Sequence, residues 1–137
     1  MKIKLLVLAC CFLGSMATTH AQVGAVKVQV PFEFHIAKQT LPAGEYLIWS
    51  VRDELFLRIA GGKTVAMVQS NRTVHDGGNS GKVVFNCYEK RCFLSQFWTP
   101  DPDESRQIPR SKPEMELAKR EVAQQFALLG EYTNGHF

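Results

Sequence analysis

Two cysteines near the middle of the chain, Cys87 and Cys92, have the spacing that most clearly permits chemistry. Such thiols either form a disulfide or, together with further Cys or His ligands, hold a zinc ion. The sequence supplies no second pair of ligands near them, and the other cysteines, Cys10 and Cys11, lie in the first segment of the chain. We therefore expect a Cys87–Cys92 disulfide that joins directly opposite positions of one β-hairpin.

No other motif with a chemical function is complete. The segment Gly61–Thr64 resembles the end of a phosphate-binding loop, but Leu57 stands where that motif requires its first glycine. Gly78–Gly81 does not match the serine-hydrolase elbow, and the acidic stretch Asp101–Glu104 has Arg106 where a calcium loop requires glycine. The histidines that follow the first segment are far apart in the sequence: His35, His75 and His136. We therefore expect no catalytic residue, no metal ion and no cofactor.

The first segment has the organisation of a secretory signal peptide. Lys2 and Lys4 supply positive charge, and residues 5–13 form an apolar stretch that is shorter than the about 20 residues needed to span a bilayer. The small side chain of Ala21 suits signal peptidase, so we expect cleavage between Ala21 and Gln22. The mature chain is then exported to a periplasm or to the outside of the cell, where disulfides persist.

Composition and charge fit one globular domain and give no sign of nucleic-acid binding. The chain has 137 residues, of which 45% are hydrophobic and 21% charged. Removing Lys2 and Lys4 from the 16 basic side chains leaves 14 against 13 acidic ones. A nucleic-acid binder usually carries a clear excess of positive charge. We expect residues 1–21 to be the signal peptide and residues 22–137 to form a single β-rich domain.

Segments with the composition of β-strands are separated by turn signals. They cover residues 26–36, 45–52, 55–60, 63–69, 82–88 and 92–98. Every even position of the first is apolar, which predicts one buried face, and Pro31 places this strand at a sheet edge or a bulge. The second is apolar on both faces and is expected in the interior of the sheet, and Gly61-Gly62 predicts a tight hairpin turn. The fold class is therefore mainly β, a small antiparallel barrel or sandwich of about six strands with one C-terminal α-helix.

The last of these segments is rich in aromatic residues. Regular alternation places Phe93 and Phe97 on one face and Leu94 and Trp98 on the other. We expect one face to pack in the core and the other beneath the following linker, residues 99–109, which has no periodicity. The alternative is an aromatic platform for a carbohydrate or a peptide.

The sequence after this linker predicts a helix over about 112–129. Ser111 and Glu114 form a capping box, and Gly130 suits the position after the helix end. One helical stripe is apolar and is expected to dock on the sheet. It consists of Met115, Ala118, Val122, Phe126 and Leu129.

Two leucines, Leu117 and Leu128, project together from nearly the opposite side of this predicted helix. Exposed leucines are common on soluble proteins and often have no role. The alternative hypothesis is that both contact a protein partner or a second copy of the chain, as apolar anchors do on a helix that lies in a groove.

Four segments resemble those of a group of small exported bacterial β-rich proteins of unknown function. They are Val30–Phe34 (VPFEF), Leu41–Tyr46 (LPAGEY), Phe93–Trp98 (FLSQFW) and Pro109–Ser111 (PRS) at the predicted helix start. The resemblance implies one exported β-rich domain with a C-terminal helix, and it brings no catalytic residue. Because that group lacks cysteines in this hairpin, the Cys87–Cys92 pair is a local variation.

We expect a non-enzymatic exported domain that binds a protein or an envelope component. The mature chain is expected to have no transmembrane segment, and self-association is an open alternative. One alternative is a carrier with an apolar ligand cavity inside the barrel. The other is a small hydrolase or isomerase in which His35 or His75 lies beside a carboxylate in a deep pocket.

Overall fold

A computed structural model describes residues 23–51, 55–73, 80–101 and 105–135, which form eleven strands and one helix. The elements in chain order are β1 (Val23–Val30), β2 (Phe34–Ile36), β3 (Gln39–Leu41), β4 (Gly44–Val51), β5 (Phe56–Gly61), β6 (Thr64–Gln69), β7 (Asn71–Arg72), β8 (Gly81–Tyr88), β9 (Arg91–Trp98), β10 (Arg106–Gln107), α1 (Lys112–Ala118) and β11 (Gln124–Gly135).

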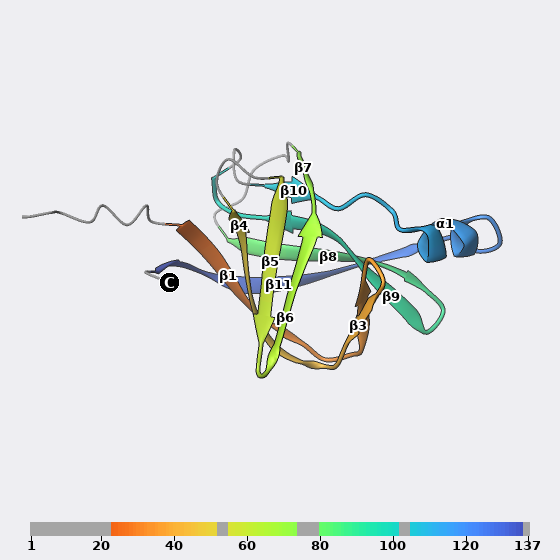
Figure 1. Cartoon of the computed structure of the whole chain (residues 1–137), viewed down its shortest axis with the longest axis horizontal. Coiled ribbons are helices and arrows are strands. Elements are labelled where there is room, and N and C mark those ends of the chain that lie inside the picture. The colour runs from red at the N-terminus through yellow and green to blue at the C-terminus, as the bar shows by residue number, and fades with distance from the viewer. Residues whose placement is uncertain (1–22, 52–54, 74–79, 102–104, 136–137) are drawn as a thin grey trace, which may run out of the picture.

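The strands form one strongly curved sheet (Figure 1) in the order β3-β2-β9-β8-β11-β1-β4-β5-β6. Neighbouring strands are antiparallel, except that β2 runs parallel to β9. After Ser70, β6 continues as β7, which pairs with β10, and β10 pairs with β9. These short strands link the β6 end of the sheet to β9, near its other end, so the architecture is a nearly closed barrel.

The interior of the barrel is filled by aliphatic and aromatic side chains. The largest fully buried ones are Phe34, Ile36, Leu41, Ile48, Leu57, Ile59, Phe85 and Phe97. Phe34 meets Phe85 and Tyr46 edge to face, with ring centroids 5.4 Å and 5.1 Å apart. Each fully buried side chain of this kind contributes about 1.5–3 kcal/mol, so these residues hold the barrel together.

The predicted mainly β class is confirmed, but the predicted number of about six strands is wrong. β3, β7 and β10 have two or three residues each, too few for alternation to reveal them. The predicted strand over 26–36 is divided into β1 and β2, and β11 lies where a helix was predicted. The edge or bulge position predicted from Pro31 is wrong for β1, which pairs with both β11 and β4; the strand ends at Val30, before Pro31, which has no N–H for the ladder. The interior position predicted for residues 45–52 is confirmed, since β4 pairs with both β1 and β5. Residues 99–109, predicted as a linker without structure, contain β10.

The predicted helix over 112–129 is wrong beyond its first two turns. It begins as expected at Lys112, but it ends at Ala118, and β11 pairs with β8 on one side and with β1 on the other. A helix in this place would leave the facing edges of β8 and β1 without main-chain partners. Gly130 accordingly lies inside β11 and does not terminate a helix.

The apolar stripe predicted to dock on the sheet does not do so. Four of its five members are exposed: Met115, Val122, Phe126 and Leu129. They lie on different elements, because the helix that would align them ends after its second turn.

A β-bulge at Ser95 interrupts the alternation of β9. The register of β8 and β9 shifts at this point, and Ser95 is the extra residue on its strand. Leu94 and Phe97 therefore both belong to the core cluster, whereas Phe93 and Trp98 do not. The predicted division of these four side chains between two faces is wrong for this reason.

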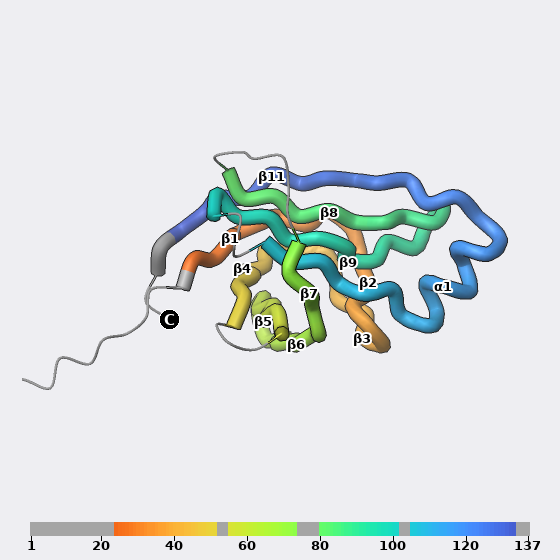
Figure 2. The backbone as a smooth tube through the Cα atoms, turned by 90° about the horizontal axis from the view of Figure 1, so that it is seen from above, coloured from red at the N-terminus to blue at the C-terminus, as the bar shows by residue number. Residues whose placement is uncertain are grey.

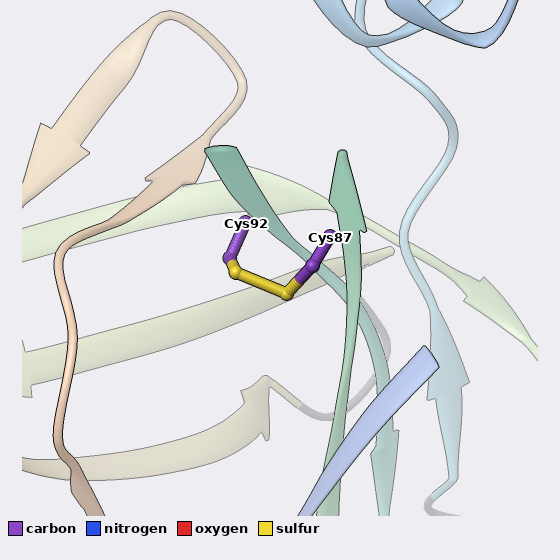
Figure 3. Close-up of a disulfide and its surroundings, with 2 residues drawn as sticks. All are labelled: Cys87 and Cys92. Carbon is purple, nitrogen blue, oxygen red and sulfur yellow. A yellow bond between two sulfur atoms is a disulfide. The ribbon is translucent and has the colours of Figure 1, made fainter. Parts of the chain in front are cut away.

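The predicted Cys87–Cys92 disulfide is confirmed. The two cysteines face each other near the end of the β8–β9 hairpin (Figure 3), with their Cα atoms 4.0 Å apart. The turn residues Glu89 and Lys90 lie between the strands, so the covalent loop is short.

Reduction of this disulfide is expected to lower the free energy of unfolding by about 2 kcal/mol, because a short loop loses little chain entropy when it is closed. Urea unfolding with and without dithiothreitol measures the difference. The Cys87→Ala/Cys92→Ala variant is the control and should not respond to the reductant. Equal unfolding midpoints for the oxidised and reduced wild-type chains would contradict a stabilising role.

Candidate functional site

The segment between β10 and β11, residues 108–123, lies over the outer face of β8 and β9, and we call it the strap. Figure 2 shows the chain passing from β10 to α1 and returning as β11 around the end of the β8–β9 hairpin. The backbone N–H of Ile108 donates a 2.8 Å hydrogen bond to the carbonyl oxygen of Ser95 at the bulge. The outer-face side chains of Asn86, Tyr88 and Phe93 are buried. The barrel thus has a second, smaller buried layer outside its main core.

Local sequence explains where the helix of the strap begins. Ser111 is the N-cap, and its side chain accepts a 3.4 Å hydrogen bond from the backbone N–H of Glu114. Pro113 lies in the first turn, where its missing N–H costs no hydrogen bond. The predicted helix start is therefore confirmed, and the Glu114 carboxylate contacts Asn86 on β8 and Arg110.

Glu114 is buried beneath the strap and is only 3% exposed. Asn86 hydrogen-bonds its carboxylate and also donates a 3.2 Å hydrogen bond to the hydroxyl of Ser95. Arg110 approaches the same carboxylate at 3.9 Å. Burial raises the pKa of Glu114 above its usual value, and the Asn86 hydrogen bond and the Arg110 charge oppose that rise. Glu114 is therefore held in place by polar contacts at some cost in desolvation.

Substitution Glu114→Gln is expected to stabilise the chain at neutral pH and to leave its stability unchanged in acid. A raised folded-state pKa means that the folded chain holds this proton more tightly than the unfolded chain. Protonated Glu114 therefore adds to the stability of the wild-type fold at pH values below the usual carboxyl pKa. This contribution is lost as the pH rises through the raised pKa of Glu114, because the buried carboxyl group then becomes charged. Urea midpoints at acidic and neutral pH test this, with exposed Glu116→Gln as the control. A variant that is less stable than wild type at neutral pH would contradict the assignment.

A groove of about 580 Å³ opens between the two ends of the strap, above the bulge. It is lined by Asn86, Ser95, Gln96, Gln107, Ile108, Pro109, Arg110, Val122, Ala123 and Gln125. Four of these residues carry side-chain carboxamides, each with one acceptor oxygen and two N–H donors. The Oε1 atom of Gln96 accepts a 2.7 Å hydrogen bond from the Trp98 indole, which leaves the NH₂ group of Gln96 as a donor. The NH₂ group of Asn86 is already used by Ser95 and Glu114, so Gln107 and Gln125 are the groove carboxamides that keep both donors and acceptor for a ligand.

A second cavity beneath α1 contains His35, Ser111 and Glu114. Its volume is about 10 Å³, which is about the space of one water molecule. His35 is held by a 3.0 Å hydrogen bond between its Nδ1 and Thr40 Oγ1, and its ring lies against Phe93 at 5.1 Å. The structure therefore brings His35 and a carboxylate to one cavity, but the cavity has no room for a substrate. His75 lies outside the described residues.

Leu117 and Leu128 are not brought together. Leu117 is half-buried on α1, whereas Leu128 is on β11 and packs against the core cluster. The shared helical surface on which the partner-contact hypothesis depended is absent from this arrangement, because the chain is a strand at Leu128. Ala21 and Gln22, the predicted cleavage site, lie outside the described residues.

The groove residues were not predicted from the sequence. The available signal was the adjacent polar pair Ser95-Gln96 within an otherwise apolar strand, which breaks the period of two and marks the bulge. Within the described ranges, no three His, Cys, Asp or Glu side chains are grouped to hold a metal ion. In the same part of the chain, no helix is long and apolar enough to cross a membrane. No protein-family model, curated protein or solved structure matches this chain.

Proposed function

We propose that the chain is an exported, non-enzymatic binding domain that holds a short extended peptide segment in the groove above the β9 bulge. The observation that carries this proposal is a groove of about 580 Å³ in which Gln107 and Gln125 offer whole carboxamides and Gln96 offers its NH₂ group. A peptide group presents one N–H and one C=O, which a side-chain carboxamide matches with its own acceptor and donors. The exposed Val122 and the neighbouring Pro109 offer apolar contacts for side chains of such a peptide.

The arrangement of the barrel supports a ligand on the outer face. Interior positions of the strands carry tightly packed core side chains, which favours external binding over a carrier function with an internal ligand. The bulge supports the same surface, since such irregularities often redirect side chains at binding sites. The disulfide fits an oxidising compartment and therefore an exported chain.

The test is a binding measurement with a mixture of short, uncharged synthetic peptides and, as a separate arm, a neutral oligosaccharide. The double variant Gln107→Ala/Gln125→Ala removes two exposed groove carboxamides and is expected to weaken peptide binding about tenfold or more, at roughly 1 kcal/mol for each lost hydrogen bond. Gln29→Ala/Gln39→Ala is the matched control, because these glutamines are exposed on β1 and β3, outside the groove.

Peptide binding that is weakened by the groove variant and unchanged by the control supports the proposal. Binding of the oligosaccharide alone would overturn the peptide assignment. Equal peptide affinities of the two double variants would overturn the groove as the site.

A further inference from the structure

A cavity of about 360 Å³ lies near the end of α1, where the turn between β8 and β9 meets the residues that follow the helix. It shares no lining residue with the groove described above. Side chains from the hairpin and from the strap therefore combine to form a second concave site.

Among the residues lining this cavity, two buried polar atoms have no hydrogen-bond partner within the described part of the chain. They are the hydroxyl oxygen of Tyr88, a residue that is 2% exposed, and the Oε2 atom of Glu121. An unsatisfied buried polar group costs about 1–3 kcal/mol, so native proteins seldom retain two beside one cavity without a ligand to bind them. A ligand for Glu121 Oε2 has to donate a hydrogen bond, because a carboxylate oxygen only accepts, whereas the Tyr88 hydroxyl can either donate or accept.

The rim of the cavity carries mainly positive charge. Lys90 and Arg91 come from the hairpin turn and Arg120 from the strap, and Glu89 adds one exposed carboxylate. These basic groups oppose a bare metal cation, and Glu121 opposes a bare anion. A small molecule that carries both charges fits this cavity. Its positive group can donate hydrogen bonds to the two unpaired oxygens, and its negative group can accept them from the basic side chains of the rim. The half-buried Leu117 adds an apolar wall.

We propose that this cavity binds a small zwitterion in which a primary ammonium group lies next to an anionic group, as in an α-amino acid. The ammonium donates to Glu121 Oε2 and to the Tyr88 hydroxyl, and the anionic group accepts from Arg120 and Arg91. The apolar part of the ligand packs on Leu117. The proposal is independent of the peptide groove. An amino acid and the phosphoethanolamine headgroup of a lipid share this chemistry, so the experiment has to distinguish these two sources.

The experiment is titration calorimetry on the mature, disulfide-bonded chain with L-leucine, phosphoethanolamine, isoamylamine and 4-methylpentanoate. Isoamylamine is the leucine analogue that lacks the carboxylate, and 4-methylpentanoate is the analogue that lacks the ammonium group. At least one zwitterion is expected to bind at least tenfold more tightly than both analogues. Binding of leucine but not of phosphoethanolamine assigns an amino acid, and the reverse result assigns the headgroup.

Substitution Glu121→Gln is expected to weaken zwitterion binding at least tenfold while leaving the affinity for 4-methylpentanoate unchanged or higher. Lys119→Gln is the matched control, since Lys119 pairs with Glu116 on the surface and does not line the cavity. Gln107→Ala/Gln125→Ala should also leave zwitterion binding unchanged. Thermal melting shows whether each variant is folded. If the Glu121→Gln variant does not fold, Tyr88→Phe is tested in its place.

Three results would overturn the proposal. They are no binding of either zwitterion, equal binding of zwitterions and single-charge analogues, and full zwitterion affinity in a folded Glu121→Gln variant.

Discussion

Replacement of Gly130 by alanine is expected to lower the free energy of unfolding by about 2–3 kcal/mol. Gly130 lies in β11 next to β1, and a Cβ atom there would overlap Val26 Cγ1 and lie 2.8 Å from the backbone oxygen of Lys27. Val26 is fully buried, so it has no free space into which to move. The added carbon therefore has to displace β11 from its neighbour, which disturbs the pairing on which the barrel depends.

Gly44→Ala is the matched control for this substitution. It adds the same carbon at a strand position beside β1, but the new Cβ would meet only Tyr46, at 3.9 Å. Its free energy of unfolding, measured in urea, should stay within about 0.5 kcal/mol of wild type. Equal destabilisation by the two substitutions would contradict a close approach of β11 to β1 at Gly130.

Deletion of Ser95 is expected to leave the chain folded and to weaken peptide binding at least tenfold. Ser95 is the extra residue of the bulge, and its removal makes the pairing of β8 with β9 regular while Leu94 and Phe97 still face the core. The deletion removes the hydroxyl that accepts from Asn86 and the carbonyl that accepts from the Ile108 N–H. The groove then loses both its shape and one of its polar groups, at a cost in stability of about 1–2 kcal/mol.

Deletion of Leu47 is the control. β4 pairs with β1 and β5 in regular register, so removing one residue turns part of the strand over and exposes its buried face. This variant should not fold, as followed by circular dichroism. Unfolding by deletion of Ser95, as by deletion of Leu47, would show that Ser95 is not the extra residue of a bulge and that the groove does not depend on one.

Features that depend on neighbours in the sequence were predicted well. Strand-like composition and turn signals predicted β1, β4, β5, β6, β8 and β9, although not the longest strand, β11. The turn at Gly61-Gly62 is a hairpin in which Gly62 has φ +55°, a conformation that glycine adopts readily. The opposite placement of Cys87 and Cys92 also followed from local spacing, because an even number of residues separates two positions that face each other across a hairpin.

Features that depend on distant partners were missed. Residues 119–129 have adequate helix propensity, and only the open edges of β8 and β1 make a strand there more stable. The short strands β7 and β10 gain their pairing only because the barrel brings them together. These contacts join segments far apart in the sequence, which periodicity along one segment does not report.

The candidate site was missed for the same reason. Glu114 has the position of a capping residue in the sequence, and its burial against Asn86 depends on how the strap crosses the sheet. The groove requires the bulge on β9 and both ends of the strap at once. No single segment contains enough of it to be recognised.

The most direct test of a peptide-binding groove above the bulge is nuclear magnetic resonance of the ¹⁵N-labelled chain from residue 22 onward during titration with the peptide mixture. The side-chain amide signals of Asn86, Gln96, Gln107 and Gln125 are expected to shift as peptide is added, because these groups line the groove. The side-chain amide of Gln69, on β6, should not shift. Unchanged groove amides in the presence of bound peptide would contradict the proposed function.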